Sequence, residues 1–385
     1  MAFPHKMLRG ILNRTIADMT LSESPGIWPQ YSQACRRDVD ALLKRGGSLS
    51  AYRANPKFGP GPAEGSWAFK LEREIERKFK VRHAVVCNSG TAALHMALDS
   101  LHLNAGDEVI TSPYTFSATV SAILMARGTP VFADVDPYTF CITPITVSAV
   151  RSALTKAVVP VHLFGRVQHH YYGLHVVHDA CQAVGAYAPY SNQSTSCAAF
   201  SFNGTKNLPC GEGGALVTNS ADSASHARLL MNHAENFGIQ RVGYNYRMNE
   251  VTACIAWHGL KDLEKRNAWR SELVKIALPE TWMEGHAYYV APFKVPAGTR
   301  PKFIQECANR GLEVTGGYIT PILSKYPAFK QYARGPLPNA TELSEQTLCL
   351  ISTLRWPATK AYARWVRGVL QAARCASGLR GWMFK

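Results

Sequence analysis

A chain of 385 residues with 46% hydrophobic and 18% charged residues has the composition of a globular protein, which excludes an intrinsically disordered chain. Its length is sufficient for a large core, arranged as one large and one small domain. No apolar run approaches the ~20 residues of a membrane span, and the N-terminus lacks the apolar segment of a signal peptide. We therefore expect a cytoplasmic protein without a membrane partner.

The net charge of +15 predicts an anionic partner or a strongly basic surface. No acidic residue follows Glu345, whereas the chain beyond it carries Arg355, Lys360, Arg364, Arg367, Arg374, Arg380 and Lys385. Two interpretations remain open: a basic helix face in solvent, or a contact with a polyanion such as nucleic acid. The ten cysteines include no Cys-x-x-Cys pair, which favours reduced thiols in a cytosol and argues against a metal site.

The first part of the chain, residues 1–60, combines few strand-like segments with many turn-forming residues, and we expect an arm packed on the main domain. Its helix is predicted over Gln30–Lys44, and a hinge rich in proline and glycine over residues 55–65. The next helix is predicted over Ser66–Phe79, because its apolar residues recur at every fourth position.

A short buried strand over Ala84–Cys87 leads directly into a turn and a strongly helical segment that begins near Gly90 and Thr91. The start of a helix after a parallel strand presents backbone N–H groups to a crevice, where phosphate binds readily. Gly90 and Thr91 are therefore candidate phosphate ligands. The alternative is ordinary N-capping of the helix by Ser89 without any ligand.

A strand that runs into an aromatic loop is predicted over Asp107–Phe116, followed by a helix over Ser117–Ala126 and a strand over Pro130–Val135. The aromatic ring at position 116 is a candidate for stacking on a planar cofactor, and the alternative is a core aromatic.

Two more buried strands are predicted over Ala157–Gly165 and Leu174–His178. His162 is either a core histidine with its own partner or a pocket residue. Only about eight residues separate the two strands, fewer than the dozen of a usual parallel crossover, so the helix expected between them is short or absent.

The segment Ala198–Lys206 is predicted to be a buried strand that presents one lysine at its end, before a glycine-rich turn and a second strand, Ala215–Thr218. Burial favours the neutral amine, the form that attacks a carbonyl. The strand before it ends in Asp179. A lysine and an aspartate at two strand ends of one sheet suit pyridoxal phosphate, whose aldehyde the lysine holds while the carboxylate keeps the ring nitrogen protonated. The alternative is a Lys206 side chain that extends into solvent.

The remaining pattern predicts an α/β fold, with a mostly parallel mixed sheet flanked by helices and a smaller α+β domain after it. Its domains would be the arm (1–60), a large cofactor-binding domain (61–266) and a small C-terminal domain (267–385). The elements predicted here are helices over Ser223–Asn236, Val251–Arg266, Pro301–Arg310, Thr341–Leu350 and Ala358–Cys375, and strands over Tyr288–Phe293 and Leu312–Gly316.

Taken in order, these motifs resemble the DegT/DnrJ/EryC1/StrS family of pyridoxal phosphate-dependent sugar aminotransferases, within fold-type I. The resemblance covers residues 60–260 well and the C-terminal third weakly. It is carried by Asn88-Ser89-Gly90-Thr91-Ala92-Ala93-Leu94, Gly106-Asp107-Glu108-Val109-Ile110, Thr115-Phe116, Asp134-Val135-Asp136-Pro137, Pro160-Val161-His162-Leu163-Phe164-Gly165, Asp179-Ala180-Cys181-Gln182, Ser201-Phe202-x-x-x-Lys206, Gly211-Glu212-Gly213-Gly214 and Gly243-Tyr244-Asn245-x-Arg247.

The resemblance implies a role for each matching residue. Lys206 would bind the cofactor aldehyde and later move the substrate proton, and Asp179 would pair with the pyridine nitrogen. The other implied cofactor contacts are Gln182 to the phenolic oxygen, Phe116 to the ring face, and Gly90, Thr91 and Ser201 to the phosphate. Members are typically homodimers with shared active sites, which implies Asn245, or less surely Arg247, from the neighbouring subunit.

Three functions remain open at this point. The first is transfer of an amino group from an amino acid donor to a keto group on a nucleotide-linked sugar. The second is a pyridoxal phosphate enzyme that acts on a modified base or side group of DNA, as in phage DNA hypermodification, which the basic charge favours. The third is a binding or regulatory protein that retains the fold. One departure from the family pattern is His178, where members usually have a glutamate.

Overall fold

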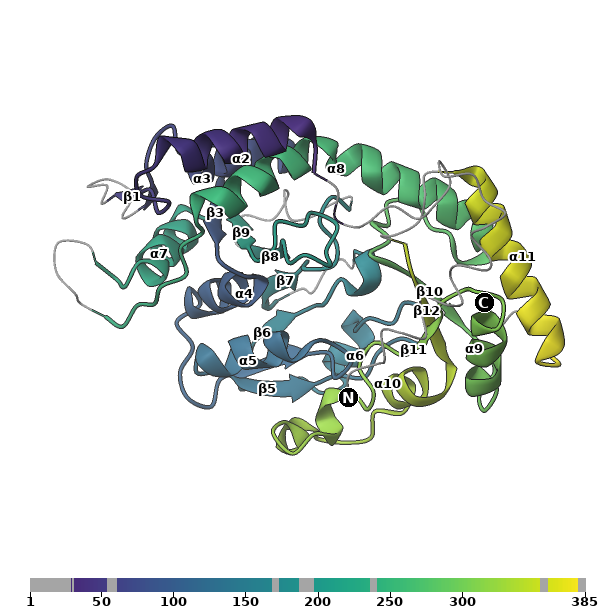
Figure 1. The fold of residues 1–385 in the computed structure, drawn as a ribbon. Coiled ribbons are helices and arrows are strands. Elements are labelled where there is room, and N and C mark those ends of the chain that lie inside the picture. The colour runs from purple at the N-terminus through teal and green to yellow at the C-terminus, as the bar shows by residue number, and fades with distance from the viewer. Residues whose placement is uncertain are drawn as a thin grey trace.

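The computed structural model describes residues 29, 31–53, 61–167, 173–186, 197–235, 241–353 and 359–379, and a seven-stranded sheet lies at their centre (Figure 1). The strand order is β3-β9-β8-β7-β6-β4-β5. Strand β9 is antiparallel to both of its neighbours and the other pairs are parallel, which confirms the predicted mostly parallel sheet. The strands are β3 His83–Cys87, β4 Glu108–Thr111, β5 Thr129–Phe132, β6 Thr155–Val159, β7 His175–Asp179, β8 Cys197–Ser201 and β9 Gly214–Thr218.

Helices cover both faces of this sheet, because its strands are apolar on both sides. In β8, Ala198 and Phe200 pack into one layer and Ala199 into the other, as the two-residue period of a strand requires. The first layer contains α3 and α8, and the second contains α4, α5 and α7. Their bounds are α3 Trp67–Phe79, α4 Gly90–Asp99, α5 Ser117–Met125, α7 Ala221–Met231 and α8 Glu250–Ala277.

The start of α3 is fixed by two side chains. The hydroxyl of Ser66 accepts the N–H of Phe69 at 3.2 Å. The carboxylate of Glu250, far away in sequence, accepts the N–H groups of Trp67 and Ala68 at 2.7 and 3.2 Å. These acceptors satisfy donors that a helix start leaves unpaired, and the helix predicted over Ser66–Phe79 is confirmed.

The described part of the N-terminal arm packs on α8 through helix α2, Gln33–Arg45 (Figure 1). Asp38 of α2 pairs with His258 of α8 at 2.9 Å. Two short strands of two residues each follow and pair with one another, β1 Tyr52–Arg53 and β2 Gly61–Pro62. Most of the predicted hinge, residues 55–60, lies outside the described residues.

The C-terminal part contains a separate antiparallel sheet in the order β10-β12-β11, with α9 and α11 packed in the same apolar cluster (Figure 1). The predicted helix over Thr341–Leu350 is wrong in its last three residues. Residues Leu348–Ser352 form β12, which pairs with strands on both sides, so long-range pairing prevails over local helix preference. The elements are β10 Val290–Lys294, α9 Arg300–Ala308, β11 Thr315–Gly316, α10 Pro338–Glu342, a π-helical turn Leu343–Thr347, β12 Leu348–Ser352 and α11 Lys360–Ala376.

Other predicted bounds also change. The strand expected over Ala157–Gly165 ends at Val159, because the chain turns at Phe164, whose φ is 61°. Helix α7 ends at Met231, well before Asn236. Helix α8 continues past Arg266 to Ala277, so the predicted domain boundary falls inside a continuous helix. Shorter elements are α6 Pro144–Ser148 and the 3-10 turns Leu163–Gly165, Pro279–Thr281, Leu323–Lys325 and Lys330–Tyr332.

Candidate active site

The residues singled out in the sequence lie after the carboxyl ends of parallel strands. Gly90 follows β3, Phe116 follows β4, Asp179 ends β7, and Lys206 follows β8. Strands β7 and β8 are direct neighbours, which pair in parallel from Val177 to Asp179. In open α/β sheets this edge is where ligands bind, because the strand ends and the helix starts meet there.

The turn before α4 combines a capped helix start with free donors. The Ser89 hydroxyl accepts the N–H of Ala92 at 3.1 Å, so the predicted N-cap is present. The N–H groups of Gly90 and Thr91 precede the first intrahelical bond, and the described residues offer them no acceptor. Ser89 therefore caps the helix, and the two N–H groups remain as donors for an anion. Phosphate binding at this turn stays a prediction.

Glycine is required at position 90 by close packing. A Cβ atom there would lie 2.8 Å from Cβ of Ser201 and 2.9 Å from Sγ of Cys181, closer than side chains approach. The structure thus brings Gly90 together with Ser201, a second predicted phosphate ligand, at the mouth of the turn. A backbone approach of this kind, with an adjacent hydroxyl, fits a bound phosphate group.

Asp179 is held in a fixed orientation. Its side chain accepts the hydroxyl of Thr119 at 2.7 Å and the backbone N–H of Cys181 at 3.2 Å, and the residue is 6% exposed. Thr119 lies 2.9 Å from the hydroxyl of Thr115. The single hydroxyl proton of Thr119 goes to the carboxylate, so Thr115 donates to Thr119. The sequence analysis missed both threonines; their i, i+4 spacing at the start of α5 was the available signal.

Lys206 lies over an aromatic ring. Its Nζ atom is 4.3 Å from the ring centroid of Tyr289, which precedes β10. Its backbone N–H donates to Asn203 at 2.8 Å in the turn after β8. Burial, together with the charge of Asp179, raises the pKa of the Cys181 thiol well above its usual range, whereas the charge of Lys206 opposes the shift. Cys181 therefore lies within the field of both predicted catalytic groups.

Gln182 is oriented by the turn at Phe164. Its Oε1 atom accepts the N–H of Phe164 at 2.8 Å, which leaves its amide N–H groups as donors. Tyr318 adds a phenol beside this amide. Burial raises the pKa of Tyr318, and the hydrogen bond to Gln182 only partly opposes the shift, so the phenol stays neutral.

Phe116 is 57% exposed at the N-terminus of α5, so it is not the core aromatic of the alternative interpretation. Its carbonyl accepts the N–H of Thr119 at 3.2 Å, in the same turn that holds Asp179. Its stacking on a cofactor ring stays a prediction.

His162 and His178 are buried together behind the strand ends. Their rings stack with an interplanar angle of 15°, and Nε2 of His162 lies 3.0 Å from Nδ1 of His178. His162 is thus a core histidine with a partner, and the residue that departs from the family pattern supplies that partner.

Asn245 lies beside the phosphate turn of its own chain. Its carbonyl accepts Nδ2 of Asn88 at 3.1 Å, and its side chain is exposed. Arg247 donates to Oδ1 of Asn232 at 2.6 Å. Their contribution to a neighbouring subunit's site stays a prediction.

In the described ranges, no three histidine, cysteine or acidic side chains lie close enough to hold a metal ion. No described helix is long and apolar enough to cross a membrane. The cysteines are free thiols, and all but Cys181 and Cys375 are buried. The cytoplasmic location stays a prediction.

The fold and these strand ends define the class of the protein, the pyridoxal phosphate-dependent aminotransferase fold. The chain belongs to the DegT/DnrJ/EryC1/StrS aminotransferase family, which it matches over residues 62–355. The resemblance predicted from the sequence is confirmed. The protein is therefore an aminotransferase enzyme with pyridoxal phosphate as its cofactor, and its substrates are a small-molecule amino donor and a keto acceptor.

Individual relatives have different names. A pleiotropic regulatory protein from Geobacillus stearothermophilus is 31% identical over 315 residues, which cover 74% of this chain and 84% of the relative. GDP-perosamine synthase from Caulobacter vibrioides is 31% identical over 281 residues, covering 65% and 75%. The structure of NtdA from Bacillus subtilis with bound cofactor PMP superposes with a TM-score of 0.73 over 89% of this chain and 83% of that chain. Its sequence is 24% identical, and the likeness shows the fold.

Proposed function

We propose that the protein transfers an amino group from an amino acid to the keto group of a nucleotide-linked sugar. The observation that carries the proposal is the edge of the sheet where Lys206 and Asp179 follow neighbouring strands, beside the free N–H groups of Gly90 and Thr91. The substrate class is supported by the family and by the relative named GDP-perosamine synthase.

Each side chain then has a task. Bound pyridoxal phosphate supplies a carbonyl that condenses with amines and a protonated ring that withdraws electrons from the adjoining carbon. The N–H groups of Gly90 and Thr91 and the Ser201 hydroxyl bind its phosphate, and Gln182 donates to its phenolic oxygen. Figure 1 labels strands β3, β7 and β8, which end at or shortly before these groups in the chain.

Proton transfer falls to two groups. The Asp179 carboxylate, held by Thr119, keeps a proton on the ring nitrogen. Nζ of Lys206 takes a proton from the substrate carbon and returns one in the other half of the reaction. Phe116 would cover one face of the bound cofactor ring and would thereby help to orient the substrate.

Nucleic acid is the alternative acceptor, and charge alone supports it. Arg364 and Arg367 lie on the exposed face of α11, opposite its buried Val366 and Leu370. This arrangement fits a solvated basic face as well as a polyanion contact.

The test starts from the holoenzyme. Glutamate or another amino donor is expected to shift the cofactor absorbance to roughly 330 nm, and a keto sugar nucleotide to reverse the shift. Lys206→Ala should abolish both changes, whereas Lys156→Ala, at an exposed lysine on β6 of the same sheet, should leave them intact.

The acceptor panel includes keto sugar nucleotides and duplex DNA. If no sugar nucleotide reverses the shift, the proposed substrate class is wrong. DNA binding that weakens steeply between about 50 and 200 mM salt would favour the alternative. A cofactor that binds but responds to no amino donor would favour a regulatory role.

A further inference from the structure

A cavity lies apart from the predicted cofactor residues. It measures about 210 Å³ and lies between the loop after β5, the turn Leu163–Gly165 and the segment that leads into β10. Neither Lys206, Asp179 nor Gly90 lines it. Phe164 lines it and also packs against Tyr318, so this residue separates the cavity from the cofactor site.

Two cations flank this cavity, and neither has a carboxylate partner among the described residues. Arg166 enters from the turn after β6, and Lys294 from the end of β10. In the described part of the chain, no carboxylate oxygen lies within 4.0 Å of either group. The hydrogen bond found for Arg166 is a long one, 3.4 Å to the carbonyl of Tyr138. The acid in the lining is Glu280, which is exposed.

A neutral donor completes the set. Nδ1 of His286 accepts the N–H of Tyr288 at 2.9 Å. Burial lowers the pKa of His286 to about 3, and the nearby charge of Arg166 adds to the shift. The imidazole is therefore neutral at neutral pH with its proton on Nε2, which makes that nitrogen a donor.

The remaining walls are flat and apolar. Phe140, Phe164 and Phe293 line the cavity, and the exposed ring of Tyr138 lies at its mouth, 5.9 Å from Nζ of Lys294. The volume is below the 300–1,000 Å³ of usual ligand pockets, so a sugar nucleotide does not fit. A small molecule with one aromatic ring or branched apolar group and one anionic group does fit the cavity.

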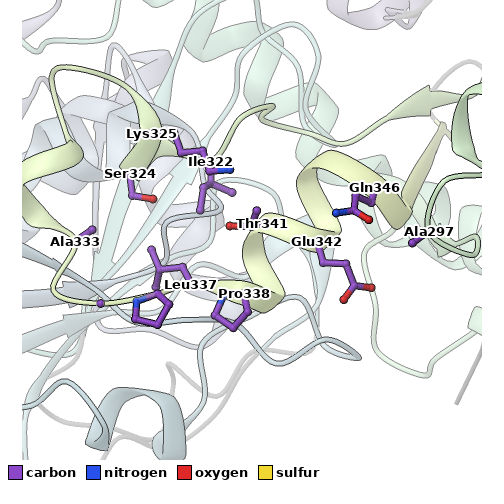
Figure 2. A pocket seen from close by; sticks show the side chains of 12 residues that line it. Ala297, Ile322, Ser324, Lys325, Ala333, Leu337, Pro338, Thr341, Glu342 and Gln346 are labelled. Atoms are coloured by element: carbon purple, nitrogen blue, oxygen red, sulfur yellow. The ribbon is translucent and has the colours of Figure 1, made fainter.

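We infer that this cavity is a binding site for a small organic anion, with its carboxylate or phosphate between Arg166 and Lys294 and its apolar body against the phenylalanine rings. The larger cleft of about 640 Å³ in the C-terminal part differs in its charges (Figure 2). There Lys325 is paired with Glu345 at 2.6 Å, and Glu342 also lines the wall, so no excess of positive charge remains.

The experiment titrates the holoenzyme calorimetrically with phenyl phosphate and with benzoate, which distinguish the two kinds of anionic group. Phenol and inorganic phosphate test the apolar body and the charge separately. We expect saturable binding of at least one aromatic anion, and none of phenol. Arg166→Gln and Lys294→Gln should each weaken it by about tenfold or more, because each removes a charge-assisted hydrogen bond.

Lys325→Gln is the matched control, since it removes a paired cation from the other cleft, and it should bind as the wild type does. Near-ultraviolet circular dichroism establishes that the variants are folded. Binding that is unchanged in both Arg166→Gln and Lys294→Gln would place the anion elsewhere and overturn the inference, as would the absence of saturable binding by folded wild type. A probe that binds at the cofactor edge of the sheet instead would be recognised because its affinity would be the same in Arg166→Gln, Lys294→Gln and the wild type.

Discussion

The Asp179 carboxylate, at the end of β7, depends on a hydroxyl that comes from helix α5. Thr119 donates to it at 2.7 Å, and Thr115 donates to Thr119 in turn. Replacement of Thr119 by valine keeps the shape and removes the donor. A lost hydrogen bond to a charged group costs about 1.5–3 kcal/mol, so kcat/KM should fall roughly 10- to 100-fold.

Thr119→Ser retains the hydroxyl and serves as the control, with an expected activity within a few-fold of wild type. The binding constant of pyridoxal phosphate, followed by fluorescence, should weaken in parallel with the loss of activity in Thr119→Val. Equal activity of the valine and serine variants would show that Asp179 does not need this donor.

His286 gives stability a pH dependence with a definite sign. Burial lowers its pKa from 6.5 to about 3, so between these values the unfolded chain binds a proton that the folded chain does not. Above pH 6.5 the titration of His286 does not lower the free energy of unfolding. Between pH 6.5 and about 3, the free energy of unfolding falls by about 1.4 kcal/mol for each unit by which the pH falls.

His286→Gln removes this titration while retaining an acceptor and a donor. Urea unfolding at several pH values between 7.5 and 4.5 should give a free-energy difference between wild type and variant that falls steadily with decreasing pH. If the free energies of unfolding of the two proteins changed in parallel with pH, the lowered pKa of His286 would be contradicted.

The sequence predicted the site residues that follow a pattern and missed those that depend on tertiary contact. Lys206 and Asp179 were found because a charged group ends an apolar strand in each case. Thr119 contacts a residue 60 positions away, and only the parallel pairing of β4, β6 and β7 brings the two together. Phe164 was predicted as strand, and its positive φ is what presents its N–H to Gln182.

Helices α3 and α7 are joined by a buried ion pair. The guanidinium of Arg228 in α7 donates to both carboxylate oxygens of Glu72 in α3 at 2.8 and 3.1 Å, and to the carbonyl of Ala84. Burial by itself lowers the pKa of Arg228, but the charge and hydrogen bonds of Glu72, together with Tyr52 and Glu76, outweigh it and the pKa is raised. Arg228 therefore stays charged.

Removal of one partner leaves the other charge buried. Arg228→Met should therefore destabilise the protein by about 3–5 kcal/mol, and the double variant Glu72→Met, Arg228→Met by less. Urea unfolding of the wild type, both single variants and the double variant gives the coupling free energy between Glu72 and Arg228. A double variant that is less stable than Arg228→Met would argue against this account.

The fold was predictable where local pattern and tertiary environment agree. The helices α3 and α4 and the strands β3, β8 and β9 were placed from periodicity and turn residues. The strand β12 was not predicted, because apolar and polar residues do not alternate in Leu348–Ser352. The segment is buried between two strands that lie far away in the sequence. The length of α8 was underestimated because its two halves pack in different apolar clusters. The first half packs against the large sheet, and the second half packs in the C-terminal core.

A single subunit leaves apolar surface exposed around the loop that carries Asn245. Val242 is 72% and Tyr244 is 36% exposed in this loop, and Phe116 is 57% exposed at the cofactor edge. Exposed apolar residues of this kind are what subunit interfaces cover. We propose, as the family resemblance implies, a homodimer in which Asn245 of one subunit contributes to the phosphate site of the other.

Mixed dimers test this arrangement directly. Lys206→Ala lacks the reacting amine, and Asn245→Asp places a negative charge where the phosphate would bind, so each homodimer should be nearly inactive. If Asn245 acts across the interface, a mixed dimer has one site with both changes and one intact site. Random mixing by unfolding and refolding should then restore about a quarter of wild-type activity. If Asn245 acts within its own chain, every site in the mixture carries one change, and activity should stay at the level of the separate variants.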